Sequence, residues 1–549
     1  MMNASRKKQS GPAGPVTKTT SLVHRKQSLS VDQAIASVGD FGLAQKFQIL
    51  LCVLTYAIAA LITILVVYSS SYVGDLENII RCTGDDTKAC EKALKETGRQ
   101  RVAFCEISQD SWEYKKYTTL VSEFDLLCGK EWLVYMATTT YFIGAATGVF
   151  LWAVLADRNQ RRTILNLGRT LAGIFSILVA TSPVMWLLLV FRLLLGMSVT
   201  LMTMSAFVLS YDITGTPWRP YCGIFLQGGF SFGVVAGTFF AWLLPRWRWL
   251  CFTTGLLPIV LTFTTWMFMI ESPQWLLEQG RKGEATSAIA SIAFGNHSRP
   301  PDSPLADPVH ILSNPRRRVI DMLKNGRLFK RIFFQGIVWV SIMVTYYSVM
   351  IMYDLVTLGS KNTAMELGFT GSLYEIAGIA AAAVVIDKIG RKPAAIIGLV
   401  ECGAALFVAS LCGGTTRQAC VVASRFGITA SIVSVLVLSW ELFPTIVVYS
   451  GIGVLNALSS IAVIATPWVG YSAYKLDSPL VPFTICGSLC LGSAVIVTSM
   501  FPETISRTIH ATIQEEDLEE SSSRPAGGSE AKKGQEPLVP VIQFSSNAV

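Results

Sequence analysis

The chain has 549 residues, of which 51% are hydrophobic and only 15% are charged, and its formal net charge is +8. This composition excludes a soluble protein of several domains, which would need far more charged surface. It is typical of a helical protein that crosses a membrane many times.

Long apolar runs predict about twelve spans, each close to the ~20 residues that a helix needs to cross the hydrocarbon core. In chain order we expect them at 48–70, 132–155, 163–181, 184–210, 221–243, 250–270, 332–353, 365–386, 393–411, 418–440, 449–471 and 480–501. The fold class is therefore an all-α polytopic membrane protein with two six-helix bundles. The expected organisation is a basic N-terminal segment 1–47, a bundle 48–270 with outer loop 71–131, a linker 271–331, a bundle 332–501 and a disordered tail 502–549.

Three landmarks repeat in the same order in the two halves. Ser205–Asp212 matches Ser434–Glu441, at an offset of 434 − 205 = 229. Asp157–Arg162 matches Asp387–Lys392, at 387 − 157 = 230, and Glu271 matches Glu503, at 503 − 271 = 232. Homologous halves with a site between them are typical of secondary transporters.

Basic residues gather in the N-terminal segment, in the short turns at 157–162 and 387–392, and in the linker. The positive-inside rule therefore predicts that these segments and both termini are cytoplasmic. Membrane topology explains the net positive charge, so the partner expected is the lipid bilayer and not nucleic acid.

The outer loop holds four cysteines, Cys82, Cys90, Cys105 and Cys128, which predict two disulfides with three possible connectivities. No spacing of cysteine or histidine predicts a metal site, and no cofactor is expected. The chain contains no Gly-x4-Gly-Lys-Ser/Thr run and no nucleophile constellation, so neither ATP-driven transport nor an enzyme is expected.

Several motifs resemble the organic cation, anion and carnitine transporters (solute carrier family 22) of the major facilitator superfamily. They are Ser111-Trp112-Glu113-Tyr114, Val121-Ser122-Glu123-Phe124-Asp125-Leu126-Leu127-Cys128, Lys130-Glu131-Trp132-Leu133, Ala156-Asp157-Arg158-Asn159-Gln160-Arg161-Arg162, Ile270-Glu271-Ser272-Pro273-Gln274-Trp275-Leu276-Leu277, Glu441-Leu442-Phe443-Pro444-Thr445 and Phe501-Pro502-Glu503-Thr504. The resemblance covers residues 31–510. It implies the major facilitator fold, the plasma membrane, and alternating-access transport of a small organic solute.

The chain departs from the family pattern at four places. Ala153 and Gln160 stand where the family usually has glycine, and Val448 stands where it has arginine. Ser460 replaces the charge, Asp in many cation transporters and Arg in many anion transporters, that would indicate the sign of the substrate. A zwitterion or a weakly charged solute fits this departure. The alternative is a transporter-derived receptor or scaffold with reduced or lost transport.

Charged residues at the predicted cytoplasmic helix ends form a candidate gating network that pairs when this side is closed. Its members are Asp157, Arg161, Arg162, Asp212, Arg219, Glu271, Asp387, Arg391, Lys392, Glu441 and Glu503. The simpler interpretation is that they mark and anchor helix ends.

Candidate substrate-binding residues lie within the spans that the resemblance places around the central site. They are Trp339, Tyr346, Tyr347, Glu375, Arg425, Asn456, Ser460 and Arg192. Trp339, Tyr346 and Tyr347 share one face of span seven, and aromatic faces attract organic cations. The resemblance implies functional roles for Glu375 and Arg425, whereas a purely structural buried pair is the competing interpretation.

The leading hypothesis is a carrier for small organic ions or zwitterions. The identity of the solute, a co- or counter-transported ion and the oligomeric state are all left open by the sequence.

Overall fold

The computed structural model describes residues 28–69, 80–83, 87–88, 90–91, 111–114, 119–306, 324–357, 364–443, 448–476 and 480–504. Within these residues, twelve helices are long and apolar enough to cross a membrane, which confirms the predicted number. An α-helix can cross the hydrocarbon core because its backbone N–H and C=O groups bond to one another within the helix.

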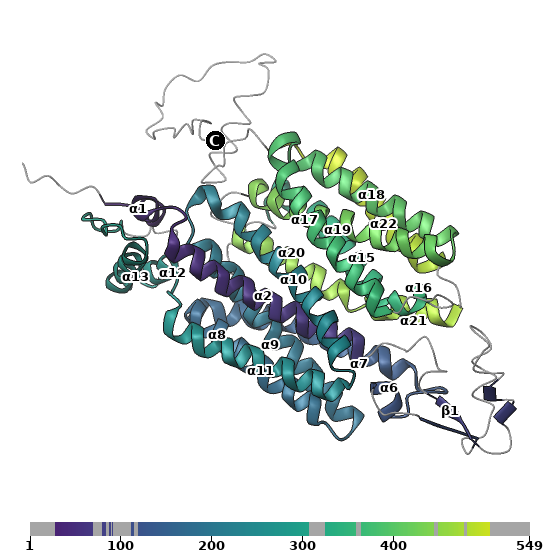
Figure 1. Ribbon diagram of the computed structural model, residues 1–549. Helices are drawn as coiled ribbons and strands as arrows, with labels where there is room; N and C mark the ends of the chain where they lie inside the picture. The colour runs from purple at the N-terminus through teal and green to yellow at the C-terminus, as the bar shows by residue number, and fades with distance from the viewer. Residues whose placement is uncertain are drawn as a thin grey trace, which may run out of the picture.

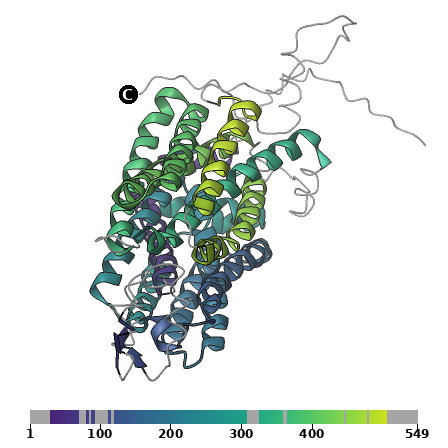
Figure 2. The same ribbon diagram turned by 90° about the vertical axis from the view of Figure 1, so that its right-hand side faces the viewer.

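The first half of the chain supplies six of the spanning helices, drawn in purple to teal (Figure 1). They are α2 (Leu43–Ser69), α7 (Trp132–Arg158), α8 (Arg161–Thr181), α9 (Met185–Asp212), α10 (Arg219–Leu243) with the short helix η3 (Thr216–Trp218) before it, and α11 (Trp247–Phe268). The second half supplies the green to yellow helices, which lie beside the first half in both views (Figures 1 and 2). They are α15 (Gly326–Ile351), α17 (Ala364–Ile389), α18 (Arg391–Leu411), α19 (Gly414–Leu442), α20 (Val448–Val463), α21 (Thr466–Leu476) and α22 (Leu480–Met500). The short helix α16 (Tyr353–Thr357) follows α15.

The eleventh span differs from its prediction because it is broken into α20 and α21. Pro467 has no N–H and so leaves the carbonyl of Val463 without its helical donor. The Thr466 hydroxyl donates to that carbonyl instead, at 2.8 Å. The apolar run from 449 to 471 indicated a membrane span, but hydropathy does not report a break.

Three short helices lie at one end of the molecule, and we call this end the α13 face (Figure 1). They are α1 (Val31–Val38), α12 (Pro273–Glu278) and α13 (Lys282–Gly295). A capping box begins α1, in which Gln33 N donates to Ser30 Oγ at 3.2 Å and Ser30 N donates to Gln33 Oε1 at 3.0 Å. The buried side of α1, which includes Ile35, packs in one apolar cluster with Ile289 and Ile292 of α13.

The opposite end, which we call the α6 face, carries strands β1 (Ile80–Cys82) and β2 (Trp112–Tyr114) and helix α6 (Leu120–Glu123). The strands pair antiparallel, with Cys82 opposite Trp112. Glu123 accepts hydrogen bonds from Trp247 Nε1 and Arg248 Nε, both at 2.7 Å, and so fastens the loop to α11. Residues of the family-like loop motifs thus lie in strand β2 and helix α6.

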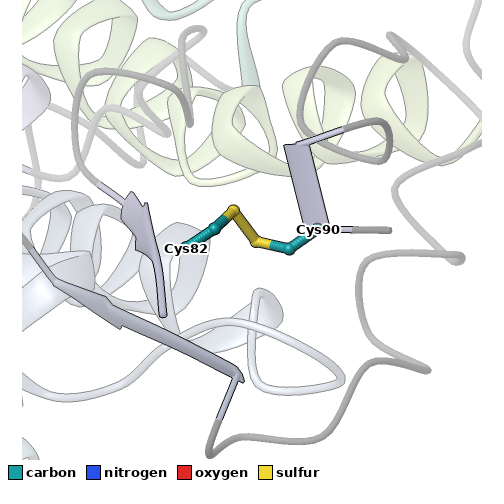
Figure 3. Close-up of a disulfide and its surroundings, with 2 residues drawn as sticks. All are labelled: Cys82 and Cys90. Atoms are coloured by element: carbon teal, nitrogen blue, oxygen red, sulfur yellow. A yellow bond between two sulfur atoms is a disulfide. The ribbon is translucent and has the colours of Figure 1, made fainter. Parts of the chain in front are cut away.

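Two of the four loop cysteines, Cys82 and Cys90, form a disulfide (Figure 3). Cys128 is also disulfide-bonded, and Cys105 lies outside the described residues. Of the three connectivities left open by the sequence, the structure selects the one that joins Cys82 to Cys90.

Candidate functional site

A buried ion pair lies between two helices of the second half. Glu375 of α17 is 0% exposed and Arg425 of α19 is 1% exposed, and Arg425 Nη2 donates to Glu375 Oε1. Charges inside a membrane protein are costly unless they are paired, and they commonly mark a functional pathway. The pair is therefore the first candidate for a solute site.

Two hydroxyl groups hold the second oxygen of the same carboxylate. Tyr346 of α15 and Ser231 of α10 each donate to Glu375 Oε2 at 3.2 Å. Arg425 also donates to the carbonyl of Tyr346 at 2.9 Å, and its guanidinium carbon lies 4.0 Å from the centroid of the Tyr346 ring. The cluster thus joins three helices of the second half to one of the first half.

Tyr347 forms another contact between the halves beside this cluster. Its ring meets Phe142 of α7 edge-on, with centroids 5.1 Å apart, and lies 5.2 Å from the ring of Tyr346. Tyr141, next to Phe142, hydrogen-bonds to Thr63 of α2 at 2.7 Å. A polar and aromatic layer therefore crosses the molecule at the depth of the ion pair.

The other predicted substrate residues lie apart from the ion pair. Trp339 donates to Ser439 of α19 at 3.0 Å, and Asn456 donates to the carbonyl of Ile452 in its own helix at 3.1 Å. Ser460 is half-buried on α20. Arg192 is fully buried and donates to Ser69 of α2 at 2.6 Å. The structure thus brings together Tyr346, Tyr347, Glu375 and Arg425 from the predicted set.

The two repeated glutamates, Glu271 and Glu503, cap the N-termini of equivalent helices at the α13 face. Glu271 accepts from the backbone N–H of Arg161 at 3.0 Å and of Arg162 at 3.1 Å, where α8 begins. Glu503 accepts from Arg391 N at 3.0 Å and Lys392 N at 3.1 Å, where α18 begins. A carboxylate at a helix N-terminus is favoured by the free N–H groups and the helix dipole.

Burial raises the pKa of Glu271, while its bonds to backbone N–H groups and the charge of Arg161 oppose that rise.

The basic side chains at the starts of α8 and α18 also make equivalent contacts in the two halves. Arg162 donates to the carbonyl of Trp266, and Lys392 Nζ donates to that of Thr498 at 2.7 Å. Each half thereby ties the start of its third helix to the end of its sixth.

The turns before α8 and α18 explain one of the family departures. Gly390 has a φ of +105°, which favours glycine, whereas Gln160 has a φ of −58°, which suits any residue. The first half therefore has no need of a glycine at this position.

The remaining network charges behave differently in the two halves. Arg391 Nε lies 3.1 Å from Glu441 Oε1, and its Nη1 lies 3.5 Å from Asp387 Oδ1. Arg161 instead donates to the carbonyl of Ala156 at 2.6 Å and lies over the ring of Trp152. Arg219 pairs with Asp32 of α1 at 2.5 Å. The side chain of Asp157 lies outside the described residues.

Two tyrosine hydroxyls cross between the halves at the α13 face, and we call this pair of contacts the tyrosine latch. Tyr449 of α20 donates to Asp212 of α9 at 2.9 Å. Tyr221 of α10 donates to Asp387 of α17 at 2.8 Å. The two tyrosines are separated by 449 − 221 = 228 residues, close to the repeat offset. Each half thus donates a hydroxyl to a carboxylate of the other.

The repeated segments also meet directly. Tyr211 and Trp440, which occupy equivalent places in the repeat, stack with centroids 4.1 Å apart and an interplanar angle of 10°. At the α6 face, Tyr135 of α7 and Tyr471 of α21 lie 5.1 Å apart between centroids. Together with Ser231–Glu375 in the middle, these contacts join the halves at three depths.

Sequence reasoning missed Ser231, Phe142, Tyr221 and Tyr449. Ser231 and Phe142 lie in apolar runs of the first half, where nothing marks them as partners of Glu375 or Tyr347. Tyr449 had a signal, because it directly follows Val448, the place where the family's arginine is missing. A tyrosine hydroxyl directly after the position of the missing arginine is a candidate to replace it as a hydrogen-bond donor.

Comparison with known proteins identifies the family to which this chain belongs. Residues 46–515 match the model of the family described as "Sugar (and other) transporter". Solute carrier family 22 member 2 of Oryctolagus cuniculus is 30% identical over 420 residues, which cover 74% of this chain and 73% of the relative. Organic cation/carnitine transporter 4 of Arabidopsis thaliana is 26% identical over 505 residues, covering 89% and 91%.

Among solved structures, the inward open xylose transporter XylE from E. coli is similar in fold, with a TM-score of 0.55 and 16% sequence identity. The match covers 86% of this chain and 98% of XylE. The twelve spans, the repeated halves and these relatives agree that the chain belongs to the sugar (and other) transporter family of the major facilitator superfamily, as a divergent member of solute carrier family 22, and is a multi-pass transmembrane transporter.

Proposed function

We propose that this transporter carries small organic zwitterions, and organic ions related to them, by alternating access around the Glu375–Arg425 pair. The observation that carries the proposal is the complete burial of this pair beside Tyr346. A buried ion pair seldom adds net stability over apolar residues of the same size, so its presence favours a functional role. Curated relatives named organic cation/carnitine transporters support the same class of solute.

The arrangement of the cluster favours a zwitterion over a simple cation. Arg425 lies on the Tyr346 ring and against Glu375, where a substrate ammonium group would gain the same contacts. A cation that displaced Arg425 would leave the guanidinium buried without its counterion, at a cost of about 3–5 kcal/mol. A zwitterion supplies a carboxylate for Arg425 as well, so every charge keeps a partner. Ser460 adds no third charge to this balance.

In the proposed cycle, the tyrosine latch and the Tyr211–Trp440 stack hold the α13 face closed, and the Tyr135–Tyr471 contact holds the α6 face closed. We place the α13 face and both termini in the cytoplasm, because the basic turns lie there. We place the protein in the plasma membrane, in line with its relatives. The receptor or scaffold alternative gains no support from the comparisons.

Uptake into oocytes tests the proposal. Labelled carnitine, tetraethylammonium and an aromatic anion are supplied at equal concentrations, with water-injected cells as the control. We expect saturable carnitine uptake that exceeds tetraethylammonium uptake at least tenfold. Saturable uptake of tetraethylammonium alone would contradict the zwitterion assignment, and no saturable uptake of any solute by protein at the cell surface would contradict transport of this class.

A further inference from the structure

A second site lies on the membrane-facing side of the molecule. A groove of about 520 Å³ runs between α2 and α10 of the first half and α17 of the second half. Its lining is Phe41, Lys46, Ile49, Leu50, Val53, Leu54, Ala57, Ile224, Phe225, Gly228, Gly229, Phe232, Ile376, Ile379, Ala380 and Ala383. On each helix these positions recur at steps of three and four, so they share one face of that helix. The groove is formed by three such faces.

The groove is open to the surroundings of the protein and almost wholly apolar. Phe232 is 60% exposed, Leu50 51% and Ile376 38%. These residues lie within membrane-spanning helices, so the medium that they face is the bilayer. The groove is therefore shaped and placed for a hydrocarbon chain.

The single charged residue of the lining, Lys46, marks the end of the groove at the α13 face. Its ammonium lies 5.7 Å from the ring centroid of Phe41, which in turn stacks on Trp218 at 4.6 Å. Lysine and aromatic side chains of this kind sit at the level of lipid headgroups. Among the described residues, the ion pairs do not include Lys46.

We propose that this groove binds one anionic phospholipid, with its phosphate beside Lys46 and an acyl chain along α2, α10 and α17. Charge complementarity selects the anionic headgroup, and the apolar lining selects the chain. On the orientation proposed above, the α13 face meets the cytoplasmic leaflet, where anionic lipids are concentrated.

A bound lipid would also influence the transport cycle. The groove needs both halves, and it lies next to the bridge between them, because Phe232 directly follows Ser231 and Ile376 directly follows Glu375. A ligand that binds only when both walls are present shifts the population toward the joined arrangement. The lipid is therefore a stabiliser of the conformation described here.

Glycine positions provide a clean test. A Cβ atom added at Gly228 meets no atom within 4 Å, and Gly228 lines the groove, so we expect the side chain of Gly228→Leu to occupy part of it. Gly492 of α22 is equally open, so Gly492→Leu is a matched control far from the groove. Lys46→Gln removes the charge, and its control is Lys475→Gln, which alters a lysine 5.7 Å from the Tyr471 ring at the α6 face.

The full-length protein is purified, stripped of lipid, and titrated with phosphatidylserine or phosphatidylcholine while native mass spectrometry counts bound lipids. We expect one phosphatidylserine to bind preferentially. We expect Lys46→Gln to weaken it roughly fivefold, and Gly228→Leu to abolish it, with both controls unchanged. Equal binding of phosphatidylcholine, or undiminished binding in both groove variants, would overturn the proposal. The readout contains no transported solute, so it is independent of the outcome of the uptake experiment.

Discussion

Glu375 and Arg425 carry opposite charges in a place where either charge alone is costly. The single variant Glu375→Gln leaves Arg425 buried without a counterion, and we expect it to lower the free energy of unfolding by about 3–5 kcal/mol. The double variant Glu375→Gln/Arg425→Gln removes both charges, so most of that loss should be restored. Thermal unfolding in detergent, followed by intrinsic fluorescence, measures the difference.

The double variant also separates a structural pair from a substrate site. If the pair binds substrate, the restored protein should reach the cell surface and still lose carnitine uptake at least a hundredfold. Uptake with an unchanged KM in the double variant would show that the pair only holds the second half together. Arg169, another fully buried arginine, donates to Thr265 at 2.7 Å and is a suitable control. Arg169→Gln should lower stability and leave the KM unchanged.

At the scale of elements, the break between α20 and α21 depends on one residue. Pro467→Ala supplies an N–H that can donate to the Val463 carbonyl, now bonded by Thr466. We expect a straighter helix and a higher Tm, because the new N–H can form the helical hydrogen bond that is missing across the break. If the break lets α21 move separately against α7, Vmax should fall several-fold with little change in KM.

Pro258, inside α11, provides the comparison for the Pro467 experiment. Pro258→Ala should raise the Tm and leave Vmax unchanged, since α11 makes no contact with the second half in the tyrosine latch or at the ion pair. A Vmax unaffected by Pro467→Ala would show that the break is a fixed bend and not a hinge.

On the scale of the whole molecule, the spans and the repeat could be predicted because apolar runs and repeated motifs are properties of consecutive residues. Tyr346, Glu375 and Arg425, which the structure brings together, could be singled out from the sequence because each is an aromatic or a charge in an apolar run. Trp339 shares a helix face with Tyr346, yet it bonds to Ser439. Periodicity shows which residues share a face, whereas only the packing of the two halves determines what that face meets.

The tyrosine latch is the part that required the structure, since Tyr221 and Tyr449 meet carboxylates from the opposite half. A hydrogen bond to a charged group contributes about 1.5–3 kcal/mol, so Tyr221→Phe or Tyr449→Phe should each shift the equilibrium about tenfold or more toward an open α13 face. Both contacts break when the two halves separate at the α13 face. The double variant Tyr221→Phe/Tyr449→Phe should therefore shift the equilibrium further toward the open α13 face than either single variant. Single-molecule energy transfer between dyes on non-natural residues at Arg158 and Lys388 reports this opening. The control Tyr374→Phe, on an exposed tyrosine of α17, should leave the distribution of inter-dye distances unchanged. If the double variant also leaves that distribution unchanged, the ion pair and the aromatic contacts alone keep this face closed.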